Sequence, residues 1–143
     1  MLENFETAKL SDQRTEVDII SKGLTILVVD DDNSHLSLIR YLLCRYGINV
    51  MLADNASLAF ELIQQNIVDL LISDIAMPGK DGYWLIQQVR SLPLSPIREI
   101  PAIALSGVSK GESYEKALAS GFQTYIQKPS NPIYLMEEVA KLL

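Results

Sequence analysis

The chain has few of the features that mark disulfide-rich, secreted or membrane proteins. Its 143 residues include a single cysteine, Cys44, which excludes an intramolecular disulfide framework and is typical of a reducing compartment. No segment approaches the roughly 18 apolar residues that a membrane helix needs. The start, MLENFETAKL, has neither the basic nor the apolar part of a secretory signal. We therefore expect a soluble cytoplasmic protein in which Cys44 is a small buried hydrophobe.

Basic residues are also scarce. Lysine and arginine number 12 against 18 acidic residues, which gives a net charge of -6 and a pI near 4.7. Because phosphate groups would be repelled, we expect no direct nucleic-acid partner. Apolar residues, by contrast, are plentiful. A hydrophobic content of 48% over 143 residues is enough for one globular domain with a substantial core.

Residues 1–23 differ from the rest of the chain. They carry eight charged side chains and few large apolar ones, and they end at Gly23. We expect either a mobile N-terminal extension or a short helix around Leu2–Leu10 that docks Leu2 and Phe5 on the domain or on a partner. Residues 24–143 then form the globular domain.

From Leu24 onward, apolar runs typical of buried strands alternate with segments of helical periodicity. The expected strands are 24–29, 48–53, 68–73, 100–105 and 122–127. Each is followed by an expected helix, the first capped by Asn33 or Ser34 and the last opened by Asn131 and Pro132. Leu58 and Ile133 are expected on buried helix faces. The alternation predicts an α/β domain with a parallel five-stranded sheet and helices on both faces.

Acidic residues follow two of these strands. Asp30, Asp31 and Asp32 come directly after the first strand, and Asp74 directly after the third. In parallel sheets the functional site lies beyond the carboxyl ends of the strands, so these acids should converge there. Crowded carboxylates repel one another, and a hard divalent cation such as Mg²⁺ removes the conflict. Asp32 is expected to cap a helix or lie in solvent instead.

A carboxylate held in this way can act as a nucleophile toward phosphorus if positive charge neutralises the transferred oxygens. Lys128, at the end of the fifth expected strand, supplies an ammonium group, and Ser106 follows the fourth strand. His35, in the first turn of a helix, is expected to be an ordinary, partly exposed side chain. The pattern thus indicates phosphoryl chemistry at the carboxyl edge of the sheet.

Residues 24–143 resemble the receiver domain of two-component response regulators. The matching segments are ILVVDDD at 26–32, LLISDIAMPGKDG at 70–82, IPAIALSG at 100–107 and YIQKPS at 125–130. All four occur in order at the family's spacing, which is highly specific. The resemblance implies a flavodoxin-like, doubly wound (βα)5 fold with the strand order 2-1-3-4-5.

The resemblance also implies roles for individual residues. Asp74 would be the phosphoacceptor, which takes a phosphoryl group from a phosphohistidine of a sensor histidine kinase or a histidine phosphotransfer protein. Asp30, Asp31 and Asp74 would hold Mg²⁺ or Mn²⁺ together with the backbone carbonyl of Ala76. Lys128 would contact the phosphoryl oxygens. The protein would be a phosphoacceptor switch that catalyses only its own phosphorylation and dephosphorylation.

Switching is implied for Ser106 and Tyr125, because Tyr125 would turn inward as Ser106 moves to hydrogen-bond a phosphoryl oxygen. Pro129 would be a cis proline. The expected output surface is the fourth helix, fifth strand and fifth helix at 113–143, which would contact a downstream protein or pair two copies on activation. Since the chain ends at Leu143 with its last helix, we expect a single-domain regulator.

Some positions depart from the family pattern. Ser106 stands where threonine is commoner, and Ala76 and Val108 stand where polar side chains often orient the attacking water, so we expect slow dephosphorylation. The alternative functions are a receiver-like interaction module that carries no phosphate and an aspartyl-phosphate hydrolase. The hydrolase is disfavoured because Ala76 occupies the position of its second acid. Flavin binding is disfavoured because the loop after the first strand is acidic.

Overall fold

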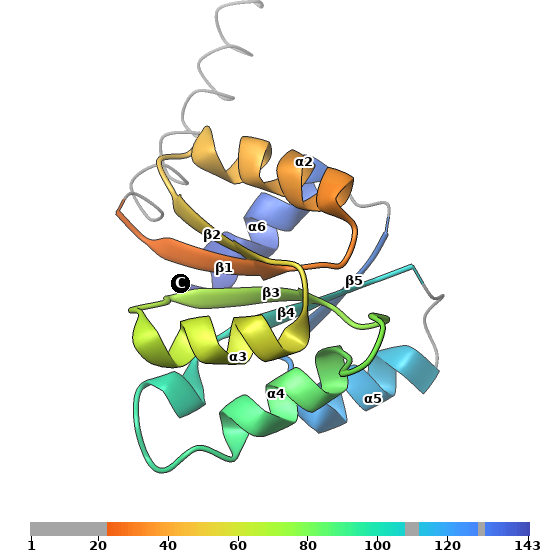
Figure 1. The fold of residues 1–143 in the computed structure, drawn as a ribbon. Coiled ribbons are helices and arrows are strands. Elements are labelled where there is room, and N and C mark those ends of the chain that lie inside the picture. Colours follow the sequence, from red (N-terminus) through yellow and green to blue (C-terminus); the bar gives the residue numbers. More distant parts are fainter. Residues whose placement is uncertain (1–22, 108–111, 129–130) are drawn as a thin grey trace, which may run out of the picture.

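The computed structural model describes residues 23–107, 112–128 and 131–143, and the side chains of residues 112 and 113 are not described (Figure 1). The expectations for the Leu2–Leu10 helix, for Val108 and for a cis Pro129 concern residues outside these ranges. Over the described part of the chain, no helix is long and apolar enough to span a membrane.

Five parallel strands form the central sheet in the order β2-β1-β3-β4-β5. The strands are β1 (Thr25–Val29), β2 (Asn49–Ala53), β3 (Leu70–Asp74), β4 (Ala102–Ser106) and β5 (Thr124–Gln127). The predicted flavodoxin-like fold and strand order are confirmed. The order in which the chain adds strands to the sheet reverses between β1 and β3. These two strands are parallel neighbours, and Val29 pairs with Ser73. The residue after β1 therefore emerges beside the last residue of β3.

The helices form two layers, one on each face of the sheet (Figure 1). They are α2 (Asn33–Cys44), α3 (Ala56–Gln65), α4 (Gly82–Arg90), α5 (Glu112–Ser120) and α6 (Pro132–Leu142), with a short 3-10 helix, η1 (Ile97–Glu99), before β4. Helices α2 and α6 cover one face, and α3, α4 and α5 cover the other. This arrangement leaves the carboxyl ends of the strands uncovered by helices.

Each face of the sheet carries its own apolar core. Leu27 and Val29 of β1 pack toward α3, α4 and α5, whereas Ile26 and Val28 pack toward α2 and α6. All four are essentially fully buried. A central strand buried on both faces requires a continuous apolar run, which is why the sequence between Thr25 and Asp30 carries no polar side chain.

Helix α2 begins one or two residues earlier than a cap by Asn33 or Ser34 would give. Asp32 is its N-cap and accepts hydrogen bonds from the backbone N–H groups of Ser34 at 2.9 Å and His35 at 3.3 Å. The expected cap by Asn33 or Ser34 is therefore wrong, and the expectation that Asp32 caps a helix is confirmed. A carboxylate with extended backbone just before the first turn is well suited to satisfy these free donors. Asn131 caps α6 as predicted.

Three side chains lie on the opposite side of their helices from the one expected. Cys44 is exposed, because the fully buried Leu43 beside it takes the inward position of α2. Leu58 and Ile133 are 37% and 63% exposed, because the inward positions of their helices are taken by Ala56, Ala59 and Ile63 in α3 and by Leu135, Met136 and Val139 in α6. Spacing alone does not decide which apolar residues of a helix face the sheet.

Candidate functional site

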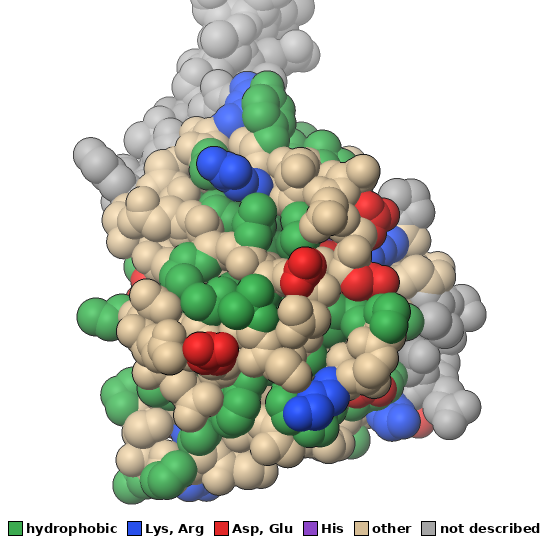
Figure 2. Space-filling view, viewed as in Figure 1, with side chains coloured by type: hydrophobic (Ala, Val, Ile, Leu, Met, Phe, Trp, Pro, Cys, Tyr) green, Lys and Arg blue, Asp and Glu red, His purple; other side chains and the backbone are tan. Residues whose placement is uncertain are grey.

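The acids that follow β1 and β3 converge as predicted. Asp30, Asp31 and Asp74 each offer one carboxylate oxygen to a group whose atoms all lie within 4.8 Å of one another. Asp30 and Asp74 are buried, and Asp31 is exposed. In Figure 2 acidic and basic side chains lie side by side at the right-hand edge, where the strand arrows of Figure 1 end. The acid cluster, as we call these three residues, therefore opens to solvent through Asp31.

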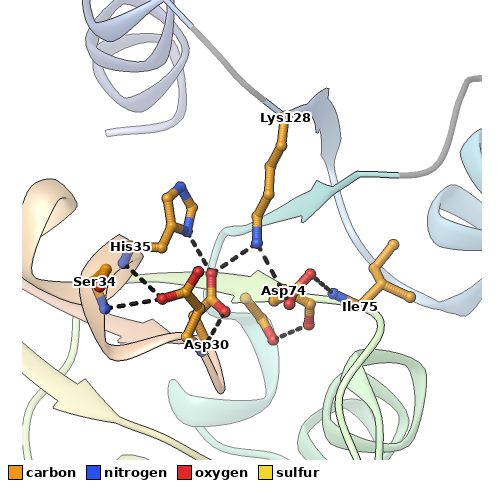
Figure 3. Close-up of polar contacts among 8 residues, drawn as sticks. Asp30, Ser34, His35, Asp74, Ile75 and Lys128 are labelled. Carbon is orange, nitrogen blue, oxygen red and sulfur yellow. Dashed lines mark hydrogen bonds and ion pairs between the residues drawn. The ribbon is translucent and has the colours of Figure 1, made fainter.

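Lys128 reaches the acid cluster from the end of β5 (Figure 3). Its Nζ lies 2.7 Å from Oδ2 of Asp30 and 3.4 Å from Oδ2 of Asp74. The backbone N–H of Lys128 donates to the carbonyl of Ser106 at 2.7 Å, which ties the root of the side chain to the end of β4. One ammonium group is thus shared between two buried carboxylates, those of Asp30 and Asp74, and it forms no ion pair with Asp31.

Asp30 is surrounded by donors. Its Oδ1 accepts the backbone N–H of Asp32 at 2.9 Å, and its Oδ2 pairs with both Lys128 and Nδ1 of His35. Burial acts to raise the pKa of the Asp30 carboxyl, but the bonds from His35, Lys128 and Asp32 outweigh it and hold this pKa well below its ordinary value. Asp30 is therefore ionised throughout the neutral range.

Asp74 has the opposite balance. Its Oδ1 accepts the N–H of Ile75 at 2.8 Å, and its Oδ2 faces Lys128. Burial raises the pKa of the Asp74 carboxyl; the charge of Lys128 opposes this, and the negative charge of Asp30 adds to it, so the net shift is upward. The two buried carboxylates are therefore unequal, and repulsion between them is only partly relieved by the shared lysine.

This donor set fits a hard divalent cation. Three carboxylates within bonding reach of one point, one of them exposed, match the oxygen ligands that Mg²⁺ and Mn²⁺ prefer. A cation at that point would also remove the repulsion that raises the pKa of Asp74. Asp32 takes no part, because its carboxylate is engaged in capping α2.

The loop after β3 is packed tightly against the site through Gly82. The N–H of Gly82 donates to the carbonyl of Ile75 at 2.9 Å, and a Cβ at this position would lie 2.3 Å from the backbone oxygen of Asp74. Only glycine fits so close an approach. Ala76, within the loop, is exposed. The close packing of Gly82, at the start of α4, therefore holds the backbone of Asp74 and Ile75 in place.

Ser106 and Tyr125 lie on the strands next to the acid cluster. Ser106 ends β4 and is fully buried, and it pairs in register with Gln127 of β5. Tyr125 is buried, and its ring meets that of Tyr114 of α5 edge to face, with centroids 5.7 Å apart. Tyr125 therefore packs between the sheet and α5.

His35 is the site residue that sequence reasoning missed. It is partly exposed as expected, but its Nδ1 contacts Oδ2 of Asp30 (Figure 3). The sequence signal that could have revealed this contact is the N-cap. Because Asp32 caps α2, His35 is the third residue of the helix and its side chain reaches back to Asp30 at the end of β1. A groove of about 360 Å³ adjoins His35 and Lys128 and runs between α2 and α6 along Leu38, Leu42 and Leu135.

Fold and site together define a doubly wound α/β domain with a cluster of three acids and a lysine at the switch point of its sheet. The model of the response regulator receiver domain family matches residues 26–140. The chain therefore belongs to the family of response regulator receiver domains. Members of this family are phosphoacceptor switch domains that act with histidine kinases.

Individual relatives differ in length. The chain is 42% identical over 116 residues to an uncharacterised 14.6 kDa protein of Leptolyngbya boryana, covering 81% of this chain and 87% of that one. It is 34% identical over 107 residues to the transcriptional regulatory protein ZraR of Escherichia coli, covering 75% of this chain but 23% of ZraR. The structure is similar to that of chemotaxis protein CheY4 of Vibrio cholerae, with a TM-score of 0.77, 26% identity, and coverage of 84% and 98%.

Proposed function

We propose that Asp74 accepts a phosphoryl group from the phosphohistidine of a sensor histidine kinase or a histidine phosphotransfer protein. The bond from phosphorus to the donor imidazole breaks as a carboxylate oxygen of Asp74 bonds to phosphorus. The released imidazole nitrogen takes up a proton from solvent, so that neutral histidine stays on the donor. The observation that carries this proposal is the convergence of three acids within 4.8 Å, with Lys128 between two of them.

The acid cluster would hold Mg²⁺ or Mn²⁺, with the backbone carbonyl of Ala76 as a further ligand. When bound, the ion supplies positive charge that offsets both the carboxylates and the phosphoryl oxygens. Asp31, exposed at the rim, gives the ion a route from solvent. Asp30, ionised because of its donors, is the ligand best prepared to receive it.

Lys128 would neutralise the oxygens of the incoming phosphoryl group. Its Nζ already lies 3.4 Å from Oδ2 of Asp74, so a small movement away from Asp30 brings it to a group attached there. An ammonium ion held at the point where negative charge accumulates stabilises the transition state without reorganisation of solvent.

Phosphorylation would be read out at the surface formed by α5, β5 and α6. Ser106 would donate its hydroxyl hydrogen to a phosphoryl oxygen, and Tyr125, packed against Tyr114, would transmit the change to α5. Residues 113–143 would then contact a downstream protein or pair with a second copy. In this form the chain would act as a response regulator or a phosphorelay carrier.

The test is incubation of the purified protein with acetyl phosphate and Mg²⁺, followed by intact-mass measurement. We expect the mass of one phosphoryl group to be added, and the addition to disappear in Asp74→Asn and on chelation of the metal. Asp54→Asn is the matched control, because Asp54 also follows a strand but is exposed and bonds only its neighbour Asn55. No modification of the wild type would instead favour a receiver-like interaction module that carries no phosphate.

A further inference from the structure

We propose that His35 is a positioning residue for the metal ligand Asp30, whose carboxylate it holds in place through Nδ1–H while Lys128 serves Asp74. The inference rests on the proposed function of the acid cluster and assigns a role to a residue outside that cluster. It predicts that the affinity of the site for a divalent cation depends on a hydrogen-bond donor at position 35.

The first step is how His35 is placed. It lies in the first turn of α2, where the cap by Asp32 fixes the backbone and the side chain is 21% exposed. In Figure 3 the ring of His35 approaches Oδ2 of Asp30 from the left, and the side chain of Lys128 approaches it from the right. Because a helix start anchors it, His35 stays in place whatever happens at β5.

The second step is the direction of the hydrogen bond. Asp30 is ionised and its oxygens can only accept, so Nδ1 of His35 must carry the proton. The other ring nitrogen, Nε2, then lies on the far side of the ring from Asp30. His35 is therefore a hydrogen-bond donor to Asp30, anchored on a different element from Lys128.

The third step is the competition for Oδ2 of Asp30. His35 and Lys128 both donate to this oxygen, but Lys128 also faces Asp74. With His35 in place, the Asp30 carboxylate keeps its orientation when Lys128 turns to Asp74. Without His35, the only side-chain donor left is Lys128, which would hold Asp30 as a direct ion pair and oppose metal entry. Loss of such an outer donor typically weakens metal binding about tenfold or more.

The experiment measures Mn²⁺ binding by electron paramagnetic resonance on untagged protein, at one pH for all variants. We compare the wild type with His35→Leu, which removes the donor, and His35→Asn, whose amide nitrogen takes the place of Nδ1. Ser37→Leu is the control, since it adds the same side chain at an exposed position of α2. We expect about tenfold weaker binding in His35→Leu and near wild-type binding in the other two.

A second measurement reports the hydrogen bond itself. Because His35 is the only histidine, the imidazole nitrogen signals in a nitrogen-15 NMR spectrum have one source. We expect a proton on Nδ1 with or without Mg²⁺. Binding in His35→Leu equal to the wild type, or an Nδ1 without a proton, would overturn the inference and leave the proposed function intact. A wild type that binds no Mn²⁺ would overturn both.

Discussion

The two ends of the sheet deal with buried charge in opposite ways. At the amino end, each charged group has partners of its own. Asp69 accepts the N–H of Thr25 at 2.8 Å. Arg90 donates to the carbonyl of Gly121 at 2.9 and 3.1 Å, to that of Arg98 at 2.8 Å, and to the side-chain oxygen of Gln123 at 3.1 Å. Burial lowers the pKa of Arg90, and these neutral oxygens accept four hydrogen bonds from its guanidinium.

At the carboxyl end, by contrast, two buried carboxylates share one lysine, and the pKa of Asp74 is raised because burial and the charge of Asp30 outweigh the charge of Lys128. The amino end is therefore arranged for stability, and the carboxyl end retains a repulsion that a cation can relieve. A site that binds and releases charge needs this residual repulsion, because a fully satisfied network would have no reason to take up a ligand.

The largest effect is expected at the amino end. Arg90→Ala should lower the free energy of unfolding by about 3 kcal/mol, because it leaves the half-buried carbonyls of Gly121 and Arg98 without this donor and removes the bonds that tie α4 to those segments. The measurement is urea unfolding followed by circular dichroism.

Arg98→Ala is the matched control. The Arg98 side chain is exposed and pairs with Glu99 at 3.7 Å, so its loss should change the unfolding free energy by less than about 0.5 kcal/mol. Equal losses in the two variants would show that the bonds of Arg90 do not distinguish the amino end of the sheet.

The residues of both ends were not equally predictable from the sequence. Asp30 and Asp74 could be placed together, because two apolar runs of strand length each end in an acid and parallel strands bring their carboxyl ends to one edge. Lys128 could be placed with them for the same reason. In these cases position along a strand determines position in space, and no side-chain conformation needs to be known.

The contacts of His35 and Arg90 could not be predicted in this way. Each depends on where a helix begins or ends, and on which loop lies within reach of a long or ring-shaped side chain. Asp32 illustrates the difficulty, because a shift of the cap by one residue turns His35 toward Asp30. Similarly, Cys44 is exposed although its neighbour Leu43 is buried, so an error of one residue along a helix reverses a prediction of burial.

An intermediate effect is expected at the carboxyl end, with the opposite sign. Asp74→Asn should raise the melting temperature at neutral pH without metal by about 3 °C, roughly 1 kcal/mol, because it removes a buried charge that Lys128 only partly compensates. Differential scanning calorimetry of the two proteins at equal concentration gives the measurement.

The pH and metal dependence of that gain identify its cause. The pKa of Asp74 is higher in the folded protein than its ordinary value of 3.8, so the charged form destabilises the fold above the folded pKa and the penalty is absent below 3.8. The gain in Asp74→Asn should therefore shrink as the pH falls through the carboxyl range. It should also shrink with Mg²⁺, which stabilises the wild type by binding. If the gain in melting temperature changed neither with pH nor with Mg²⁺, the charge of Asp74 would not be its cause.

The smallest effect is expected for Asp32, which adjoins the acid cluster without belonging to it. Asp32→Asn should change the unfolding free energy by less than about 0.5 kcal/mol, because asparagine caps a helix as well as aspartate does. It should change Mn²⁺ affinity by no more than about twofold, since it removes only an exposed, screened charge. Asp31→Asn makes the same substitution at the neighbouring exposed acid and should weaken binding about tenfold, because Asp31 offers a ligand atom. Equal losses in the two variants would mean that net charge at this edge of the sheet, rather than three placed carboxylates, holds the cation.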